Sequence, residues 1–329
     1  MNTFGTLFKV SIFGESHGNS IGVMMDGVPA GIKLSEEDFL DDLDKRKPKA
    51  LGTTPRKESD YPHIISGVFN GYTTGSAIVV TFENNNVNDK DYSNLVTQPR
   101  PGHSDYTASV KYKGFNDYRG GGPFSGRLTL GFVVAGVVAK KILKNINITS
   151  ELVSIHGNTN KNEFEEEVYK AMENRDSVGG TIRVTAHNVE KGLGEPYFNS
   201  VESCVSHIMF SIPAVKGVSF GVGFSGEKLY GSEYNDLIID EEGTTRTNNN
   251  GGINGGITNG NDIICNVFIK PTPSISHPQE TFDFKKNEIS TLEIIGRHDS
   301  CIALRAKVVV ESALAIALAD LYLIEKAYK

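Results

Sequence analysis

One apolar stretch rich in small residues constrains the fold of this chain more than any other. Between Arg127 and Lys144 the sequence predicts a helix with Gly131, Ala135 and Ala139 at four-residue intervals. Residues with this spacing share one face of a helix, and small side chains there let another element approach closely. We therefore expect this helix at the centre of the fold. Its most apolar part, residues 128–138, is too short to span a bilayer.

Short apolar and alternating runs predict the remaining elements. Strands are expected at residues 22–25, 64–69, 77–82, 180–186, 218–222 and 263–269, and helices at 36–45, 163–173, 201–210 and 302–327. Because strands and helices do not alternate regularly, the pattern favours an α+β fold over a doubly wound parallel sheet. No convincing linker interrupts the chain, so we expect a single domain over residues 1–329.

Composition narrows the possible functions. Hydrophobic residues make up 38% and charged residues 22% of the chain, which allows a sizeable core. The formal net charge of -7 argues against nucleic acid or a membrane as the main partner. The three cysteines are far apart and form no CxxC, so neither disulfides nor a metal site is expected. The N-terminus lacks a signal-peptide core, and we expect a cytoplasmic protein.

Two segments contain histidines in polar, turn-forming surroundings. His17 lies in Gly-Glu-Ser-His-Gly, and His103 lies in Arg-Pro-Gly-His-Ser-Asp-Tyr between Arg100 and Asp105. An imidazole titrates near neutrality and can transfer a proton, while arginine binds phosphate or carboxylate through paired hydrogen bonds. Taken alone, the first segment is also compatible with an ordinary loop histidine, and the second with a turn held by a surface salt bridge.

Glycine-rich segments predict a backbone that approaches a ligand closely. Residues 118–127 place three consecutive glycines before the central helix, where N–H groups and the helix dipole favour an anion. The Asn- and Gly-rich loop 248–260 can approach a flat ligand. The next strand ends in Lys270 and several hydroxyls, which suit a phosphate or ring carbonyls. Turn-rich hairpins and flexible surface loops are the alternatives.

The arginines gather near these segments. The chain has 10 Arg against 23 Lys, and the lysines are spread along helices and tails. Six arginines lie within or beside the segments above, the turn at residues 44–48 or the segment 296–301: Arg46, Arg100, Arg119, Arg127, Arg297 and Arg305. This pattern is expected if cations converge on a ligand with several phosphate or carboxylate groups.

Ten motifs in order resemble the chorismate synthase family over residues 4–315: FGESHG, DGVPAGI, DLDKRKP, RPGHSDYT, DYRGGGPFSGR, GLGEPYF, SIPAVKGV, NGGINGGITNG, KPTPSI and GRHDSC. The resemblance implies an anti 1,4-elimination that converts 5-enolpyruvylshikimate 3-phosphate to chorismate and phosphate. It also implies a requirement for reduced FMN without net redox change. NADPH is then an indirect reductant, supplied through an external flavin reductase. Family members are homotetramers with a helical layer sandwiched between antiparallel β-sheets.

The resemblance also assigns roles to residues. His17 is similar to the proton donor toward reduced flavin, His103 to the histidine that protonates the departing phosphate, and Asp299 to the aspartate that assists removal of the C6 proton. The substrate carries a phosphate and two carboxylates. The arginines that match the family's substrate-binding positions, here called clamps, are Arg46, Arg100, Arg127 and Arg297. Arg46 also matches a nicotinamide-nucleotide contact. Positions that match FMN contacts are Ser125, Ala214, Gly255, Lys270, Pro271, Thr272, Pro273, Ser274 and Arg297.

The chain departs from the family pattern after the triple glycine. Pro123 and Phe124 stand where many members have Arg and Ser, and Pro213 replaces a common Asn. The stretch after Pro48 is shortened and lacks a second Arg that often accompanies nicotinamide-nucleotide contacts, and the segment 158–162 is also short. The altered Pro-Phe pair keeps a second hypothesis open, a non-catalytic sensor that binds an anionic metabolite or flavin. A phosphate-binding lyase without flavin is a third.

Overall fold

Two antiparallel sheets organise the chain. The computed structural model describes residues 2–53, 60–84, 89–294 and 298–328. The larger sheet has the order β1 (Thr3–Phe4), β2 (Lys9–Gly14), β3 (Ser20–Asp26), β7 (Ile78–Glu83) and β4 (His63–Ser66). The other has the order β10 (Val215–Phe220), β13 (Ile263–Ile269), β9 (Gly180–His187) and β8 (Asn147–Ile155). Every pairing within these sheets is antiparallel.

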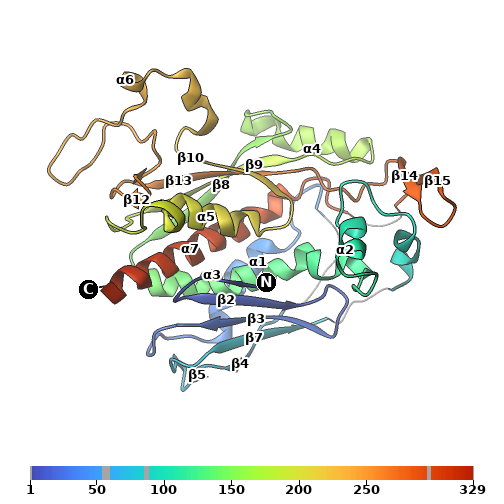
Figure 1. Cartoon of the computed structure of the whole chain (residues 1–329), viewed down its shortest axis with the longest axis horizontal. Coiled ribbons are helices and arrows are strands. Elements are labelled where there is room, and N and C mark those ends of the chain that lie inside the picture. The colour runs from blue at the N-terminus through green and yellow to red at the C-terminus, as the bar shows by residue number, and fades with distance from the viewer. Residues whose placement is uncertain (1, 54–59, 85–88, 295–297, 329) are drawn as a thin grey trace.

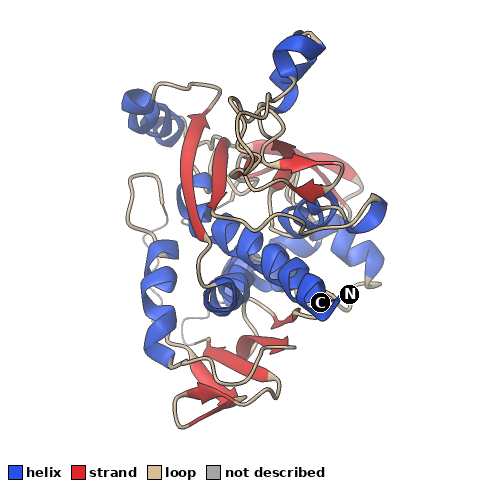
Figure 2. Ribbon diagram, turned by 90° about the vertical axis from the view of Figure 1, so that its left-hand side faces the viewer, coloured by secondary structure: helices blue, strands red, loops and turns tan. Residues whose placement is uncertain are grey.

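Helices lie between the two sheets in both views of the molecule (Figures 1 and 2). The layer contains α1 (Leu40–Arg46), α3 (Leu130–Leu143), α5 (Val201–Phe210) and α7 (Ala303–Tyr328). Shorter helices lie outside it: α2 (Asp105–Lys111), α4 (Phe164–Glu173) and α6 (Gly231–Tyr234). Three two-stranded hairpins complete the strands: β5 (Val68–Phe69) with β6 (Tyr72–Thr73), β11 (Ile253–Asn254) with β12 (Ile257–Thr258), and β14 (Gln279–Asp283) with β15 (Glu288–Leu292).

Short 3-10 turns connect these elements. They are η1 (Glu36–Phe39), η2 (Asp89–Val96), η3 (Arg119–Phe124), η4 (Gly126–Thr129), η5 (Lys161–Glu163), η6 (Tyr197–Asn199) and η7 (Gly223–Lys228). At the start of η1, the Asp38 carboxylate accepts a hydrogen bond from the Ser35 N–H at 2.8 Å, as a capping box requires.

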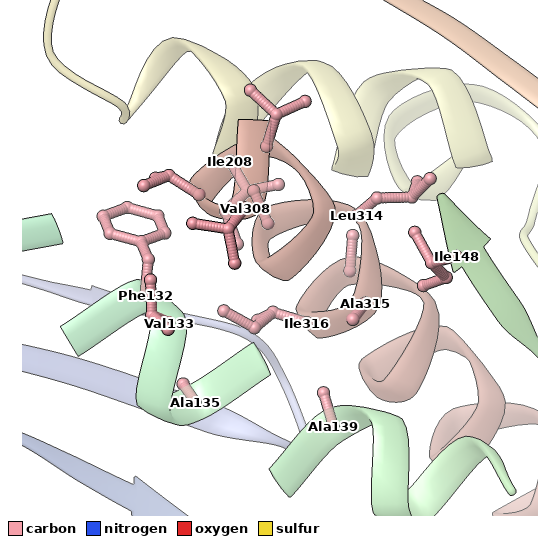
Figure 3. Packing of buried hydrophobic residues seen from close by; sticks show 14 of the residues in the cluster. Phe132, Val133, Ala135, Ala139, Ile148, Ile208, Val308, Leu314, Ala315 and Ile316 are labelled. Carbon is pink, nitrogen blue, oxygen red and sulfur yellow. The ribbon is translucent and has the colours of Figure 1, made fainter. Parts of the chain in front are cut away.

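The core forms where α3 packs against α7 and both helices face the sheets. Figure 3 shows Phe132, Val133, Ala135 and Ala139 of α3 facing side chains of α7, with Ile148 of β8 at the edge of the same cluster. The helices approach so closely that a Cβ on Gly136 would lie 2.3 Å from the Cβ of Ser312. The prediction that the small-residue helix is central is therefore confirmed.

A buried carboxylate attaches the N-terminal strands to this layer. Asp320 of α7 accepts hydrogen bonds from the backbone N–H groups of Thr6, Leu7 and Phe8 at 2.8, 2.7 and 2.8 Å. Three N–H donors satisfy a carboxylate that is only 6% exposed. The contact fixes the start of β2, and the turn after β2 contains His17.

The predicted α+β class with antiparallel sheets is confirmed, and most predicted elements are present. Some bounds were wrong. The strand expected at 64–69 is two strands in different sheets, because Gly67 has a φ of +84° between them. The strand expected at 218–222 begins at Val215 and ends at Phe220, just before Gly221 at φ +55°. The central helix is α-helical only from Leu130, after the 3-10 turn η4.

Candidate active site

Two histidines far apart in sequence face the same glycine-rich loop, residues 119–125, which we call the glycine loop. A Cβ built on Gly120 would lie 2.3 Å from the His17 Cε1 atom and 2.4 Å from its Nδ1 atom. A Cβ on Gly121 would lie 3.4 Å from the His103 Cε1 atom and 3.5 Å from its Nε2 atom. Adjacent residues of one loop therefore bring the two imidazoles into one site.

The glycine loop needs its glycines for backbone reasons too. Gly120, Gly121 and Gly122 have φ values of +58°, +83° and +51°, a region that residues with a Cβ rarely adopt. The Gly122 carbonyl accepts a hydrogen bond from the Ser16 N–H at 3.1 Å. This bond joins the loop to the turn that contains His17. The His17 ring is 5% exposed and packs edge-on against Tyr92, with ring centroids 5.2 Å apart.

The Asp117 carboxylate lies close enough to His17 to interact with its charge. Asp117 accepts hydrogen bonds from Arg119 Nε at 2.9 Å and Nη2 at 2.8 Å. These bonds, together with the charges of Arg119 and His17, hold the pKa of Asp117 below its usual value against the opposing effect of burial. Arg119 is one of the arginines predicted to lie near the ligand, whereas no role was predicted for Asp117.

His103 belongs to a compact charged loop, residues 100–105, which we call the His103 loop. Its Nδ1 atom lies 2.6 Å from Asp105 Oδ1. Arg100 donates to both oxygens of Asp105 at 2.7 Å, and its Nη1 donates to the Ser274 hydroxyl at 2.9 Å. Burial opposes ionisation of Asp105, but hydrogen bonds from Arg100 and His103 outweigh it and hold the pKa of Asp105 well below its usual range.

Residues 270–274 pack against the His103 loop. Lys270 donates from its backbone to the Ala214 carbonyl at 3.0 Å, and its Nζ donates to the Gly102 carbonyl at 2.5 Å. Burial, with a smaller contribution from the charge of Lys216, lowers the pKa of Lys270. Ala214 takes a φ of +72° there. Of the predicted cofactor positions, Lys270 and Ser274 thus contact the His103 loop, Ala214 binds the Lys270 backbone, and Pro271, Thr272 and Pro273 connect Lys270 to Ser274.

One hydroxyl in this segment has no partner within the described ranges. The Thr272 Oγ1 atom is buried and makes no hydrogen bond there, although the Thr272 carbonyl accepts from the Ser177 hydroxyl at 2.7 Å. A buried hydroxyl without a partner costs free energy unless a ligand satisfies it. This hydroxyl, in the segment between Lys270 and Ser274, is the kind of group that a bound cofactor would complete.

Two predicted clamps, Arg46 and Arg127, share Asp60. The Asp60 carboxylate lies 3.4 Å from Arg46 Nη1 and 2.8 Å from Arg127 Nη1, and all three residues are at most 8% exposed. Burial lowers the pKa of Arg46 to about 10, with the Asp60 charge acting in the opposite direction. Asn84 holds the other edge of Arg127 through Nε at 2.8 Å. Asp60 was not identified from the sequence, because no motif marks it.

The segment before α7 adds another ion pair. Asp299 accepts from Arg305 Nη1 at 2.9 Å, and Arg305 Nε donates to the Arg46 carbonyl at 3.1 Å. Next to it, burial and the charge of Arg100 lower the pKa of His298, which favours the neutral imidazole. Its Nε2 atom is buried without a hydrogen-bond partner in the part of the chain that is described. The predicted clamp Arg297 lies outside the described residues.

Two more predicted cofactor positions are Ser125, at the end of the glycine loop, and Gly255. Ser125 caps the turn η4 through a hydrogen bond from the Arg127 N–H to its hydroxyl at 3.3 Å. Gly255 lies in the turn between β11 and β12, at the opposite end of the molecule from α2 in Figure 1. A Cβ there would meet no atom within 4 Å, so its face is open. Within one chain, Gly255 therefore lies apart from the other predicted cofactor positions.

An apolar cavity of about 270 Å³ borders the Asp105 side of the His103 loop. Its lining includes Leu95, Tyr106, Tyr118 and Phe284. Within the described ranges, no cluster of histidine, cysteine or acidic side chains is arranged to hold a metal ion. No helix in that part of the chain combines the length and the apolar character needed to cross a membrane.

Comparison with known proteins decides the family. The family model described as chorismate synthase matches residues 8–323. The chain belongs to the chorismate synthase family. A chorismate synthase of Chitinophaga pinensis is 52% identical over 99% of this chain and 98% of its own length. One of Methanocaldococcus jannaschii is 43% identical over 98% of this chain and 96% of its own. A crystal structure of chorismate synthase superposes with a TM-score of 0.76 at 28% identity, covering 98% of this chain and 93% of the other.

Membership of the chorismate synthase family makes this chain a carbon–oxygen lyase of the shikimate pathway, which leads to the aromatic amino acids. The family assignment also shows that the Pro-Phe pair after the triple glycine does not remove the chain from the family. In the structure, Phe124 is 38% exposed and its ring lies 6.4 Å from the Tyr112 ring, away from both histidines' contacts with Gly120 and Gly121.

Proposed function

We propose that this chain converts 5-enolpyruvylshikimate 3-phosphate to chorismate and phosphate with His17 and His103 as proton donors and reduced FMN as cofactor. The observation that carries the proposal is the meeting of both imidazoles at consecutive glycines. In the reaction the bond between the ring and the phosphate oxygen breaks, a proton leaves C6, and the double bonds rearrange. An unassisted loss of phosphate and of a weakly acidic proton is slow, so the site must supply charge and protons.

His103 is proposed to protonate the phosphate as it departs. A leaving group that carries less negative charge leaves more readily, and a positioned general acid contributes about 10²- to 10⁴-fold in rate. Arg100 lies beside it and adds positive charge where negative charge develops. The ion pair with Asp105 already occupies Nε and Nη2 of this arginine, and Nη1 donates to Ser274, so its proposed substrate contact would use the second N–H of Nη1.

His17, Arg46, Arg127 and Asp299 form the rest of the proposal. His17 would keep a proton available on the flavin side, and the two buried arginines would hold the substrate's anionic groups. Asp299 would assist removal of the C6 proton, with Arg305 fixing the carboxylate. We also propose that Arg297 contacts substrate and FMN, and that Arg46 contacts a nicotinamide nucleotide.

The residues present fit a flavin phosphate and ring. Lys270 and Ser274 supply a cation and a hydroxyl, and the buried Thr272 hydroxyl lacks a partner among the described residues. Ser125, Ala214, Pro271 and Pro273 would contribute contacts from the neighbouring loops. When bound, the reduced flavin supplies electron density as phosphate leaves and recovers it later. NADPH would enter only as the source of electrons for an external flavin reductase.

The orphan hydroxyl gives this cofactor assignment its own test. We expect Thr272→Val to leave the unfolding midpoint of the ligand-free protein unchanged or slightly higher, because the substitution removes a buried unsatisfied oxygen. It should weaken FMN binding in the presence of substrate by about 10-fold, the value of one hydrogen bond of about 1.4 kcal/mol. Flavin absorbance titration measures the affinity; an unchanged affinity would remove Thr272 from the cofactor site.

We further propose that the layered arrangement of Figure 1 is the family's β-α-β sandwich, that residues 1–329 form one domain, and that the enzyme acts as a cytoplasmic homotetramer. One continuous cluster of buried side chains supports the single domain. The tetramer is supported by the location of Gly255, whose open face at the end of the molecule opposite α2 is available to another copy. No nucleic acid or membrane partner is included in the proposal.

The test is an anaerobic assay with photoreduced FMN. We expect equal amounts of chorismate and phosphate from the wild type. His17→Ala and His103→Ala should each lose at least about 100-fold in kcat. The control His156→Ala should keep wild-type turnover, because the His156 side chain is 65% exposed and pairs with Glu167. Turnover without any flavin would refute the cofactor, and full activity of either histidine variant would refute its role. Turnover with NADPH and FMN but no reductase would show that the chain reduces its own flavin.

A further inference from the structure

Asp105 is bound into the same loop as His103 by an unusually complete set of contacts. Its Oδ1 atom lies 2.6 Å from His103 Nδ1. Its Oδ2 accepts from the backbone N–H of Arg100 at 3.1 Å, and the Arg100 guanidinium binds both oxygens at 2.7 Å. The Asp105 side chain is 7% exposed. Its carboxylate therefore has one orientation, defined by the loop itself.

We propose that Asp105 is a positioning residue for the reaction: it fixes the tautomer and the ring orientation of His103 so that the Nε2 atom carries the transferable proton. The proposal rests on the role assigned to His103 above. It gives a function to Asp105, to which the family motifs assigned none. It also explains why Asp105 follows His103 at a distance of two positions.

The tautomer follows from the donor and acceptor chemistry. An ionised carboxylate can only accept hydrogen bonds, so a contact of 2.6 Å requires a proton on His103 Nδ1. Arg100 Nη2 also lies near Nδ1, at 3.1 Å, but it already donates to Asp105 Oδ1 at 2.7 Å. The Ser104 hydroxyl, 3.4 Å from Nδ1, can turn its proton elsewhere. The lone pair or second proton of the ring is therefore on Nε2.

The Nε2 atom points in the direction that catalysis needs. It is the ring nitrogen nearest the position of a Cβ on Gly121, at 3.5 Å. The Nε2 atom of His103 therefore faces the glycine loop, in which the neighbouring residue Gly120 contacts His17. The protonated ring that donates to a leaving phosphate is a cation, and the Asp105 carboxylate stabilises this form. A carboxylate behind a catalytic histidine acts in the same way in other enzyme classes.

Several charges act on His103, and they decide the expected pH dependence. Asp105 favours the imidazolium, whereas Arg100 opposes it; Lys270 reaches Gly102 of the same loop, and His298 is close enough for its pKa to be affected by His103. Removing the one anion leaves only neutral or positive neighbours among these groups. An Asp105→Asn variant therefore stabilises the imidazolium of His103 less than the wild type does.

The experiment measures kcat and KM across pH for Asp105→Asn, His103→Ala and the double variant, with reduced FMN under anaerobic conditions. We expect Asp105→Asn to lose about 100-fold in kcat with KM changed less than about threefold, since general-acid catalysis contributes 10²- to 10⁴-fold. The decline of kcat toward high pH should move to lower pH. The double variant should be no slower than His103→Ala, and Asp105→Glu should recover part of the loss.

The matched control is Asp42→Asn, which removes a carboxylate that is 8% exposed and paired with Lys45 and Lys140 in the helical layer. It should lower stability without changing the pH profile of kcat. Wild-type kcat and pH profile in Asp105→Asn would overturn the proposal, as would a double variant much slower than His103→Ala. Wild-type turnover of His103→Ala would instead refute the role of the histidine on which the proposal rests.

A measurement on the unaltered enzyme covers the case in which Asp105→Asn fails to fold. Long-range ¹H–¹⁵N spectra of histidine-labelled protein report which ring nitrogen carries the proton of a neutral imidazole. We expect the Nδ1-protonated form for His103 at high pH. Free imidazoles in water prefer the other form, so a merely structural carboxylate would not produce this signature. An Nε2-protonated His103 would overturn the proposal.

Discussion

The sharpest test of the site is a single methyl group on Gly120. A Cβ there would lie 2.3 Å from His17 Cε1, 2.4 Å from His17 Nδ1 and 2.7 Å from the Ser16 hydroxyl oxygen, whereas ordinary contacts begin at 3.4 Å. The His17 ring would have to retreat by about 1.1 Å, the difference between 3.4 and 2.3 Å. Since His17 is 5% exposed and its ring packs against Tyr92, the ring can only move by tilting away from its present position.

Two effects of Gly120→Ala can be separated by a matched variant. A residue with a Cβ at φ +58° costs about 1–2 kcal/mol in stability. Gly114→Ala incurs the same kind of cost, since Gly114 has a φ of +79°, but a Cβ there would meet no atom within 4 Å. Both variants should lose similar stability in urea denaturation. Only Gly120→Ala should also displace the histidine.

The assay is turnover with photoreduced FMN under anaerobic conditions. A displacement of about 1 Å in a catalytic group costs about 100-fold in rate, so we expect that loss for Gly120→Ala and nearly wild-type kcat for Gly114→Ala. Gly121→Ala provides an intermediate case, because its Cβ would meet His103 at an ordinary 3.4 Å. Equal kcat values for Gly120→Ala and Gly114→Ala would refute the claim that Gly120 seats His17.

Two further predictions concern stability. Gly136→Ala should destabilise the protein by about 1–3 kcal/mol, because its Cβ would lie 2.6 Å from the Ser312 Cα. The control Gly131→Ala should be nearly neutral, because its Cβ would meet the flexible Ile12 side chain at 3.0 Å. Urea denaturation midpoints compare the two variants, and equal midpoints would contradict the close contact between α3 and α7. The depressed pKa of Asp105 means that its contribution to stability is present above the unfolded-state pKa of about 3.9 and is lost as pH falls below it. Asp105→Asn should therefore flatten the fall in urea midpoint below pH 4, and an unchanged slope would show that the ion pair contributes nothing.

The elements with strong periodicity could be predicted from the sequence. The helix Val201–Phe210 and the strand Ile263–Ile269 have the predicted bounds, because Ser200 caps the helix and the strand alternates between buried and more exposed residues. The strand Asn147–Ile155 was missed, since its Thr, Ser and Glu residues lack a clear alternation and a bulge interrupts its pairing. Helix α2 was missed because its seven residues follow a turn motif and bury only Ala108.

The candidate site could be predicted only in its residue types. Both histidines and the glycine loop stand out locally, and the structure brings these segments together. What no local pattern contains is the partner of each arginine. The pairing of Arg127 with Asp60, 67 positions away, depends on how the chain folds over the central helix. The location of Gly255, in the turn between β11 and β12, is likewise set by the fold and not by any local pattern.

The pairing of the arginines changes how an acidic protein can bind a trianionic substrate. Each described clamp already has a carboxylate neighbour: Arg46 and Arg127 share Asp60, and Arg100 holds Asp105. The guanidinium groups are therefore oriented before any ligand arrives, and the carboxylates offset the repulsion between their charges in a buried site. An incoming phosphate must share these groups with their present partners or replace a carboxylate. Affinity then reflects the difference between two ion pairs, whereas the proposed proton donors and their carboxylates would stabilise the transition state, in which negative charge develops on the leaving oxygen.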